Sequence, residues 1–356
     1  MRIAQVAPLY ESVPPKLYGG TERVVSYLTE ELVRQGHDVT LFASGDSVTS
    51  ARLSNGCDEA LRLNGSPGPA ALAQHLHMVE RVAQQAHRFD VIHFHLDFLP
   101  FSTIRSGGFP AVTTLHGRQD LPGQFALFRE FDDINLVSIS DAQRTAMPWA
   151  NWVATVHHGL PSHLYTPHRP GSEYLAFLGR IAKEKRVDRA VEIARRAGMK
   201  LQVAAKIDEA DRDYAESVCG FLEEPHVTFL NEIGDDGKCA FLSKAAALLF
   251  PIDWPEPFGL VMIEAMACGT PVIAFRGGSV EEIIEDGVSG FIVDSVDEAV
   301  EAIKRLRTLD RRRCRKVFEE RFSARRMCNE YLRVYKRAIA LNATVNSTQL
   351  DRAAVA

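Results

Sequence analysis

The chain reads EPFGLVMIE from Glu256 to Glu264, so that a proline and a glycine lie between two glutamates. Proline is accepted in the first turn of a helix, and it pushes the residue before it out of helical geometry. The pattern therefore predicts that Glu256 lies in a loop, that a helix begins beside it, and that Glu264 lies about two turns inside that helix. At a rise of about 1.5 Å per residue, the two carboxylates would lie about 10–12 Å apart.

A helix start of this kind suits a phosphorylated ligand. The N–H groups of the first turn form an anion site, and Gly259 has no Cβ that would keep a ligand away from the backbone. The spacing of the glutamates fits a diphosphate that carries a hydroxylated group at each end. The alternative is a surface helix with two solvated glutamates.

The stretch belongs to an alternation of strands and helices along the whole chain. Short apolar runs predict strands, and amphipathic segments such as Glu22–Gln35 separate several of them. The predicted strands of the first half are Ile3–Ala7, Val39–Ala43, Val91–Phe94, Ala111–Leu115 and Leu136–Ile139. Those of the second half are Tyr174–Leu178, Leu201–Ala204, Val227–Phe229, Ala246–Phe250, Val272–Ala274 and Phe291–Val293. This pattern predicts an α/β fold with two doubly wound parallel sheets and a ligand cleft between two domains.

The expected domain boundaries follow from a stretch rich in proline and histidine, Pro161–Pro170, which is the linker candidate. We expect an N-terminal Rossmann-like domain over residues 1–160, a linker over 161–172 and a C-terminal Rossmann-like domain over 173–323. A helix over 324–341 is expected to pack back toward the N-terminal domain. The polar residues 342–356 are expected to form a tail that frays.

The composition is that of an ordinary soluble globular protein, with 46% hydrophobic and 24% charged residues. A net charge of −5 argues against a general nucleic-acid binder. No apolar run approaches the roughly 20 residues of a membrane span, and the N-terminus does not resemble a signal peptide. Six scattered cysteines without a Cys-x-x-Cys pair favour reduced thiols and a cytoplasmic location over disulfides or a zinc site.

A basic run, Arg311–Lys316, precedes the C-terminal helix. We interpret it as a solvated basic face. The alternative is a weak peripheral contact with anionic lipid headgroups at a membrane surface.

Three other segments carry groups that suit a diphosphate ligand. Arg180 and Lys185 follow the first strand of the second half, and two positive charges would stabilise a diphosphate leaving group in the absence of a metal. Gly19 and Gly20 precede a helix, where a bare backbone lets a phosphate or sugar approach. His116 follows an apolar strand, at the edge where strand ends meet a ligand. The alternatives are a charged surface loop, an ordinary loop and a structural histidine.

Two nucleotide-binding fingerprints are missing from the sequence. No G-x-G-x-x-G follows the first strand, which disfavours a dehydrogenase, and no G-x-x-x-x-G-K-[ST] occurs, which disfavours a P-loop nucleotidase.

The order of these segments resembles that of the retaining glycosyltransferases of family 4, also called group 1 glycosyltransferases, which have the GT-B fold. The resemblance extends from Arg2 to about Tyr335 and is nearest to the branch that contains the avilamycin antibiotic glycosyltransferase. The matching segments are Gly19-Gly20, His116, Gly179-Arg180, Glu184-Lys185, Glu256–Glu264, Ala265–Val272, Gly277-Gly278-Ser279, Asp286-Gly287 and Gly290-Phe291.

The resemblance implies an acceptor-binding first domain and a donor-binding second domain. The implied reaction is the transfer of a hexosyl group, with retention at the anomeric carbon, from a nucleotide diphosphate sugar, expected to be UDP-linked. The acceptor would be a small molecule, a glycan or a lipid. Neither a metal nor another cofactor is expected, and the leaving phosphate would itself accept the proton of the acceptor.

The resemblance also implies roles for four charged residues. Arg180 and Lys185 would neutralise the donor diphosphate. Glu264 would accept hydrogen bonds from the ribose hydroxyls, and Glu256 would hold the hydroxyls of the donor sugar.

Backbone groups and one histidine would complete the site. The amides of Phe258, Gly259 and Leu260 would contact the sugar and the phosphate. The Gly19-Gly20 loop would cover the phosphates from the other domain, and His116 would touch the donor sugar and help to orient the acceptor.

Four positions depart from the family pattern. Arg186 replaces a glycine and would add a third positive group near the phosphate, and Glu281 replaces a proline. Ala205-Lys206-Ile207 replaces glycines, which leaves the nucleobase contacts undefined, and His158 replaces an asparagine.

Two motifs could hold a metal ion. Asp211-Arg212-Asp213 has a D-x-D pattern, with a solvated helix start as the favoured alternative. His93 and His95 share one strand face, with Asp97 beyond them. A metal there needs further ligands that the sequence does not identify, so an acceptor contact or packing is the favoured alternative.

Two other functions fit the same fold. A nucleotide-sugar epimerase would isomerise the donor without an acceptor, and a non-catalytic nucleotide-sugar-binding protein would bind the nucleotide without turnover. Acceptor contacts are expected from the loops Leu9–Lys16, Ser44–Pro69 and His116–Phe125, which carry no readable code.

Overall fold

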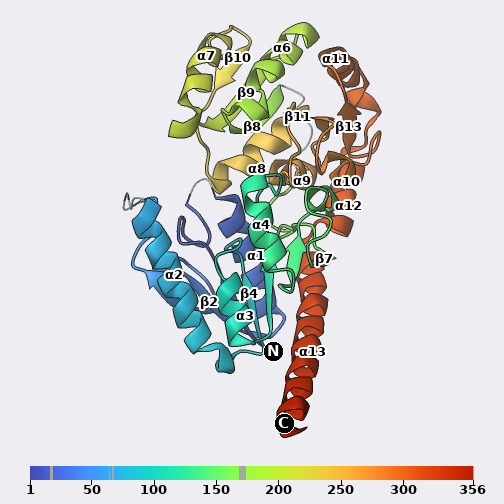
Figure 1. The fold of residues 1–356 in the computed structure, drawn as a ribbon. Coiled ribbons are helices and arrows are strands. Elements are labelled where there is room, and N and C mark those ends of the chain that lie inside the picture. Colours follow the sequence, from blue (N-terminus) through green and yellow to red (C-terminus); the bar gives the residue numbers. More distant parts are fainter. Residues whose placement is uncertain (17–18, 64, 66–67, 168–173, 356) are drawn as a thin grey trace. The chain divides into compact units, whose positions relative to one another are not determined.

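The structure divides the chain into two compact units (Figure 1). The computed structural model describes residues 1–16, 19–63, 65, 68–167 and 174–355, and the side chains of these residues except 235–236 and 345–355. The first unit is Met1–His157 with Ala324–Ala356, and the second is His158–Ser323. Each contains one parallel sheet with helices around it, which confirms the predicted α/β class with two Rossmann-like sheets.

The first unit has a seven-stranded sheet in the order β3-β2-β1-β4-β5-β6-β7. Its strands are β1 (Arg2–Val6), β2 (Asp38–Ser44), β3 (Arg52–Cys57), β4 (Val91–Phe94), β5 (Ala111–Thr114), β6 (Leu136–Ser138) and β7 (Trp152–Thr155). Its helices are α1 (Gly20–Arg34), α2 (Gly68–Gln84), α3 (Phe101–Gly107), α4 (Phe125–Glu130), α5 (Asp141–Arg144) and α13 (Ala324–Val355), with short 3-10 helices η1 (Ala86–Arg88) and η2 (Pro122–Gln124).

The second unit has a six-stranded sheet in the order β10-β9-β8-β11-β12-β13. Its strands are β8 (Leu175–Arg180), β9 (Leu201–Lys206), β10 (Val227–Phe229), β11 (Ala247–Phe250), β12 (Val272–Phe275) and β13 (Gly290–Val293). Its helices are α6 (Val187–Ala197), α7 (Arg212–Leu222), α8 (Asp235–Lys244), α9 (Leu260–Ala267), α10 (Val280–Ile283), α11 (Val296–Arg305) and α12 (Arg311–Arg321), with 3-10 helices η3 (Lys183–Lys185), η4 (Glu209–Asp211) and η5 (Leu306–Thr308).

All the predicted strands are present, and the structure adds β3 and β7, the two edge strands of the first sheet. Central parallel strands are buried on both faces and form continuous apolar runs. β3 reads RLSNGC and is partly exposed along its length, and the four residues of β7 are only half buried. Neither edge strand therefore has the apolar run on which the prediction depended.

The first sheet is buried on both faces. Leu41 and Phe42 are neighbours on β2, yet they belong to two separate apolar clusters. Successive side chains of a strand point to opposite faces, so each cluster covers one face of the sheet. The larger cluster includes Phe94, Phe101 and Phe128, from β4, α3 and α4.

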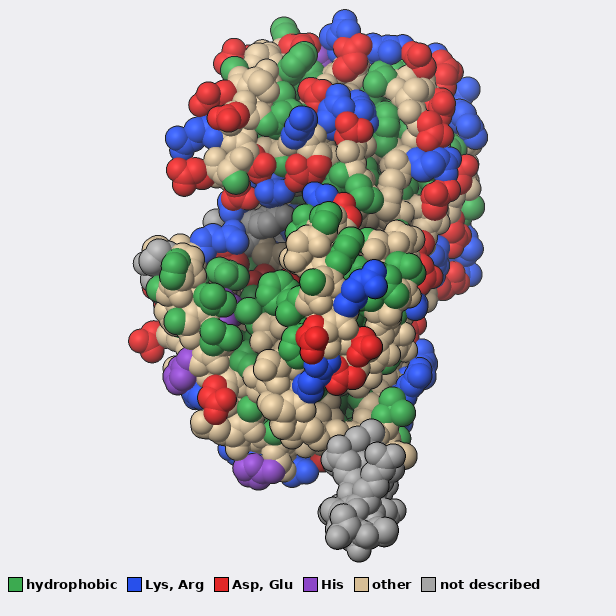
Figure 2. All heavy atoms as spheres, viewed as in Figure 1, with side chains coloured by type: hydrophobic (Ala, Val, Ile, Leu, Met, Phe, Trp, Pro, Cys, Tyr) green, Lys and Arg blue, Asp and Glu red, His purple; other side chains and the backbone are tan. Residues whose placement is uncertain are grey.

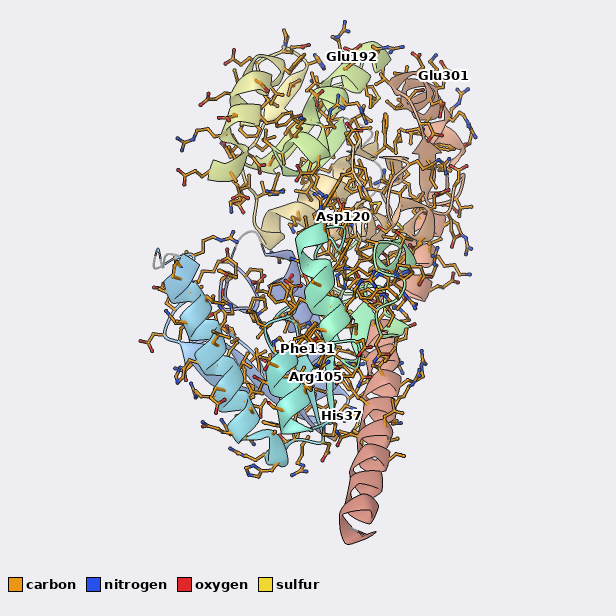
Figure 3. All side chains as sticks on the ribbon, in the orientation of Figure 1. His37, Arg105, Asp120, Phe131, Glu192 and Glu301 are labelled. Carbon is orange, nitrogen blue, oxygen red and sulfur yellow. The ribbon has the colours of Figure 1, made fainter. Side chains whose placement is uncertain are left out.

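A charged side chain joins α3 to the end of α4. Figure 3 shows Arg105 beside Phe131, and the guanidinium carbon lies 4.3 Å from the ring centroid. The same guanidinium pairs with Glu130 at 3.1 Å and with Asp133. The arginine thus covers an aromatic ring at the rim of the core and holds the segment that leads into β6.

The C-terminal helix is longer than the sequence pattern predicted. α13 runs as one helix to Val355, whereas we expected it to end at residue 341 and to be followed by a fraying tail. Residues 342–355 contain neither proline nor glycine, so no helix breaker ends it earlier. α13 packs on α1, β4 and β5 of the first unit.

The first part of the predicted linker belongs to the second unit. Residues 168–172 of that linker lie outside the described residues. Leu160 forms a β-bridge with Ser323. Arg315 of α12 donates hydrogen bonds to the carbonyl oxygens of Ser162 and Tyr165, at 2.7 and 2.6 Å. The chain is therefore fixed to the second unit over these residues.

The basic run Arg311–Lys316 is only partly a solvated face. Arg311 donates to the carbonyl oxygens of Ala245 and Ser243 at 2.8 and 3.0 Å. Arg311 and Arg315 are therefore structural, and only Arg312, Arg313 and Lys316 of the run are exposed. Figure 2 shows acidic and basic side chains mixed over the visible face of this unit. Among the described residues, no helix is both long and apolar enough to cross a membrane.

Candidate active site

The predicted donor residues come from the carboxyl ends of neighbouring strands in the second sheet. β8 and β11 lie side by side and parallel, so the loops that follow them begin at the same edge. Arg180 ends β8 and Lys185 lies five residues on, whereas Glu256 lies in the loop after β11. This strand order brings Lys185 and Glu256 together although they are far apart in the sequence.

The side chains of Lys185 and Glu256 form an ion pair at this edge. Lys185 Nζ donates a hydrogen bond to Glu256 Oε2, and Trp254 Nε1 donates to the same oxygen at 2.9 Å. The ammonium group also lies 4.9 Å from the centroid of the Trp254 ring. Glu256 is 8% exposed, so the carboxylate is almost buried and two donors fix its position.

The α9 helix begins later than predicted. Gly259 has φ +78° and caps the helix, which starts at Leu260. Because Pro257 is still in the loop, Glu264 is the fifth residue of α9 and lies little more than one turn inside it, and the expected two turns are wrong. A Cβ on Gly259 would lie 2.8 Å from Met262 Cε and 3.0 Å from Phe250 Cζ, so the left-handed conformation and the crowding both require glycine.

The start of α9 and the loop before it contain the three residues whose amides were predicted to contact the ligand. Leu260 is in the first turn, where a helix has no internal acceptors for its N–H groups. Phe258 is buried in the loop and packs against the rings of His158 and Phe322, at 4.7 and 6.3 Å between centroids. His158 thus fills a packing position next to the site.

Glu264 faces the interior of the second unit. It is 1% exposed. Tyr165 OH and Lys238 Nζ both donate to Glu264 Oε1, at 2.9 and 3.0 Å. The carboxylate is thus oriented by two donors from outside its own helix, one of them an ammonium group.

Arg180 is surrounded by carboxylates. It pairs with Glu184 at 2.6 Å, with Asp211 at 2.7 Å and with Asp208 at 3.5 Å. Lys206, at the end of β9, pairs with Asp208 at 2.7 Å. Burial raises the pKa of Asp208, but the hydrogen bond from Lys206 and the nearby Arg180 outweigh it and the pKa is lowered. An anionic ligand of Arg180 must therefore compete with these carboxylates.

The backbone conformation of Arg186 explains why the family pattern has a glycine at this position. Its φ is +53° and it caps α6, a left-handed position that glycine adopts without strain. Its guanidinium pairs with Asp188 at 2.9 Å and with Asp253 at 3.0 Å, and the hydrogen bond that it donates to Asp188 raises its pKa. The third positive charge expected near the phosphate is therefore balanced by these two carboxylates.

The glycine pair after β12 supports the Glu256 loop. A Cβ on Gly278 would lie 2.2 Å from Glu256 O, so only glycine allows this approach. Ser279 N donates to Glu256 O, and Ser279 Oγ donates to Phe258 O, both at 2.9 Å. The Gly277-Gly278-Ser279 motif therefore holds the loop that carries Glu256 and Phe258.

His116 lies at the carboxyl edge of the first sheet, just beyond β5. His116 Nε2 lies 2.8 Å from His95 Nδ1, and His95 Nε2 lies 2.9 Å from Gln5 Oε1. Burial lowers the pKa of His116 to about 3. The imidazole is therefore neutral at physiological pH, and it suits hydrogen bonding better than proton abstraction.

Gly19 and Gly20 lie at the start of α1 in the first unit. A Cβ on Gly19 would lie 2.7 Å from Pro15 Cβ, so a side chain would displace the loop. Gly20 is exposed and begins the helix. The two residues just before them, 17–18, lie outside the described residues.

Side chains of the two motifs that could hold a metal ion form other interactions. His93 Nδ1 bonds Tyr335 OH and His93 Nε2 bonds Thr114 Oγ1, both at 2.7 Å, so neither nitrogen is open to a metal. Asp211 pairs with Arg180. Within the described part of the chain, no group of three or more His, Cys, Asp or Glu side chains is arranged to hold a metal ion.

Three residues of the site were not predicted. Trp254 and Tyr165 donate to the two glutamates, and Gln5 bonds His95, the partner of His116. Trp254 lies two residues before Glu256, so a sequence signal existed for it. Tyr165 lies in the predicted linker and carries no such signal.

Two units, each built on a parallel Rossmann-like sheet, are the architecture of the GT-B glycosyltransferases. Residues 166–321 match the family model of glycosyl transferases group 1, and residues 18–197 match the model of Glycosyltransferase Family 4. The chain belongs to glycosyltransferase family 4, and it is a glycosyltransferase.

Three relatives illustrate the similarity. The phosphatidyl-myo-inositol mannosyltransferase of Mycobacterium leprae is 27% identical, over 84% of this chain and 85% of its own. AviGT4, a glycosyltransferase involved in avilamycin A biosynthesis, superposes with a TM-score of 0.71 at 23% identity, over 96% of this chain and 98% of its own. Anabaena HepE, in complex with UDP and glucose, superposes with a TM-score of 0.73 at 18% identity, over 94% of this chain and 99% of its own.

Proposed function

We propose that this glycosyltransferase moves a sugar from a UDP-sugar to a hydroxyl group of an acceptor, with retention at the anomeric carbon and without a metal. The observation that carries the proposal is the pair of oriented carboxylates, Glu256 and Glu264, on either side of the start of α9. The choice of UDP as the nucleotide is supported by the structure of the similar HepE in complex with UDP and glucose.

The two carboxylates suit different parts of the donor. Glu264 is buried and held by Tyr165 and Lys238, which suits the ribose hydroxyls of a deeply bound nucleotide. Glu256 lies in the loop before the helix and is held by Lys185 and Trp254, which suits the hydroxyls of the transferred sugar. The first-turn N–H groups of α9 lie between them in sequence and suit the diphosphate.

Positive charge for the leaving diphosphate comes from Arg180 and Lys185. Each is paired with carboxylates of its own unit, so the diphosphate replaces or shares these partners on binding. An arginine fork and a lysine point charge then stabilise the charge that develops as the sugar leaves. This accounts for the chemistry without a metal ion.

His116 contributes to the binding of the donor sugar as a neutral imidazole. A group whose pKa is about 3 is a weak base at neutral pH. This supports a reaction in which the leaving phosphate takes the proton of the acceptor on the same face of the sugar. His116 then holds and orients hydroxyl groups.

The acceptor is proposed to be a small molecule, a glycan or a lipid, contacted by loops of the first unit. The name of the similar mannosyltransferase contains phosphatidyl-myo-inositol, which favours including lipids among the acceptors.

All six cysteines are free thiols, which supports a cytoplasmic location. Weak membrane contact would depend on Arg312, Arg313 and Lys316, of which Arg313 and Lys316 pair with Glu320.

A donor panel tests the proposal. The protein is incubated with UDP-, GDP- and ADP-sugars and a set of acceptors in the presence of a chelator, and release of the nucleoside diphosphate is measured. We expect acceptor-dependent release from a UDP-sugar and an anomeric configuration in the product that matches the donor. Isomerisation of the donor alone would indicate an epimerase instead. Nucleotide binding without turnover on any acceptor would indicate a binding protein.

A further inference from the structure

A continuous chain of buried side chains runs beneath His116 in the first unit. His116 bonds His95, His95 bonds Gln5, and Gln5 Nε2 donates to Tyr335 OH at 2.9 Å. Gln5 lies on β1 and is 0% exposed, and Tyr335 lies on α13 and is also 0% exposed. The C-terminal helix α13 is thus connected through these hydrogen bonds to His116, just beyond β5.

The orientation of the Gln5 amide determines which atom donates in each hydrogen bond of this series. Gln5 turns its NH₂ group to Tyr335 and its carbonyl oxygen to His95 Nε2. A carbonyl oxygen only accepts, so His95 carries a proton on Nε2. His95 is 3% exposed, and burial disfavours a charged imidazole, so the ring is neutral and its Nδ1 accepts. The partner of that Nδ1 is His116 Nε2, at 2.8 Å, which must therefore donate.

His93 is the second hydrogen-bond partner of the Tyr335 hydroxyl. Tyr335 OH accepts from Gln5 and so donates its proton to His93 Nδ1, at 2.7 Å. His93 then donates from Nε2 to Thr114 Oγ1, at 2.7 Å, and Thr114 lies 3.0 Å from Tyr331 OH. Each bond from Gln5 to Thr114 then joins one donor to one acceptor, so the direction set by Gln5 is consistent along these bonds.

We propose that His95, oriented by Gln5 and Tyr335, is a positioning residue that holds His116 in the Nε2–H tautomer, so that His116 Nδ1 is a hydrogen-bond acceptor for a sugar hydroxyl. The sugar in this statement rests on the proposed function, whereas the tautomer does not. The reversed chain, with the Gln5 amide turned over, would place the proton of His116 on Nδ1 and make it a donor.

The tautomer is measured directly, without a substrate. In protein labelled with ¹⁵N-histidine, the side-chain nitrogens of His116 are identified by their loss in His116→Gln. At neutral pH we expect the signature of a protonated Nε2 and an unprotonated Nδ1. A protonated Nδ1 on His116 would overturn the proposal, whether or not the protein is active.

Two tyrosine variants give a matched comparison. Tyr335→Phe and Tyr331→Phe each remove one buried hydroxyl from the same face of α13, but only Tyr335 bonds Gln5. We expect Tyr335→Phe to give a mixture of His116 tautomers and to lower kcat by about fivefold, the worth of one hydrogen bond, with little change in KM for the donor. Tyr331→Phe should leave the His116 signals as they are. Equal tautomer signals in both variants would contradict the role of Gln5.

Substitution of His95 separates positioning from packing. In His95→Asn the side-chain oxygen can occupy the place of Nδ1 and accept from His116, whereas His95→Leu offers no acceptor. The asparagine variant should therefore retain the Nε2–H tautomer and most of kcat, and the leucine variant should lose both. If the leucine variant is folded and keeps the wild-type tautomer, His95 does not position His116. If no donor is turned over by the wild type, the proposed function fails and the ¹⁵N measurement still decides the tautomer.

Discussion

Lys185 and Glu256 come from loops after two neighbouring strands and form an ion pair at the edge of the second sheet. The pair is nearly buried, and Trp254 donates to the same carboxylate oxygen. A charge in such a position needs its partner, because removal of either one leaves the other poorly solvated.

The first prediction concerns the stability of this pair. Lys185→Met should lower the free energy of unfolding by about 1–3 kcal/mol, because Glu256 then keeps a buried charge without its ammonium partner. The double variant with Glu256→Gln should recover about 1 kcal/mol of the summed losses. Urea unfolding of the two single variants and the double variant measures this coupling, and strictly additive losses would contradict it.

The second prediction concerns the start of α9. Gly259→Ala forces a left-handed residue with a Cβ against Met262 and Phe250, and it should lower the free energy of unfolding by about 2 kcal/mol or more. Gly36 is the matched control, since its φ is +82° but a Cβ there meets no atom within 4 Å. Gly36→Ala should therefore report backbone strain alone, about 1 kcal/mol. Equal losses in the two variants would show that the crowding around Gly259 is unimportant.

The third prediction concerns Arg186. Arg186→Gly removes the strain of a left-handed residue, about 1 kcal/mol, but also removes the ion pairs with Asp188 and Asp253. Arg186→Ala loses the same ion pairs and keeps the strain. The glycine variant should therefore be more stable than the alanine variant by about 1 kcal/mol in thermal or urea unfolding. An alanine variant as stable as the glycine variant would contradict the strained backbone.

The fourth prediction concerns pH. Burial lowers the pKa of His116 to about 3, whereas an unfolded histidine titrates near its ordinary value of 6.5. As the pH falls below about 6.5, the unfolded state therefore binds a proton that the folded state does not bind, and the free energy of unfolding decreases by at most about 1.4 kcal/mol per pH unit from this group. His116→Gln should reduce this slope between pH 6.5 and 5.

Unfolding in urea at several pH values measures the slope. His77, which is exposed on α2, provides the matched control. His77→Gln should leave the slope as in the wild type, and a slope that His116→Gln does not change would contradict the buried neutral imidazole.

Much of the fold was predictable because buried parallel strands carry their own signal. β8 to β13 each contain a short apolar run, and every one was identified from it. The edge strands β3 and β7 were missed because a half-exposed strand has no such run. The end of α13 was also missed, because the polar residues after Asn342 suggested a tail although no helix breaker stands there.

The candidate site was predicted by residue type but not by partner. Glu256, Glu264, Arg180 and Lys185 were identified from strand ends and spacing, yet the pairing of Lys185 with Glu256 depends on β8 lying next to β11. The same strand order places carboxylates around Arg180, which the local sequence does not indicate. Strand order is set by the packing of the whole unit, so side chains that meet across it cannot be read from one segment.

The helix start shows the limit of local reasoning. Pro257 fits the first turn of a helix, but Gly259 takes a left-handed conformation and the helix begins after it. The choice between these starts depends on the Gly277-Gly278-Ser279 loop, which bonds Glu256 and Phe258 from a distant part of the chain.

The central claim is that the two glutamates at the start of α9 hold different parts of one nucleotide-sugar donor, and titration calorimetry with UDP, GDP and ADP tests it most directly. One of these diphosphates, expected to be UDP, should bind the wild type and should bind Glu264→Gln about tenfold or more weakly, because hydrogen bonds from the ribose to a charged group are lost. The same nucleotide, which lacks the transferred sugar, should bind Glu256→Gln at least as tightly as the wild type, because this substitution leaves Lys185 to the diphosphate. Failure of all three to bind the wild type, or equal affinity for the wild type and Glu264→Gln, would contradict the account.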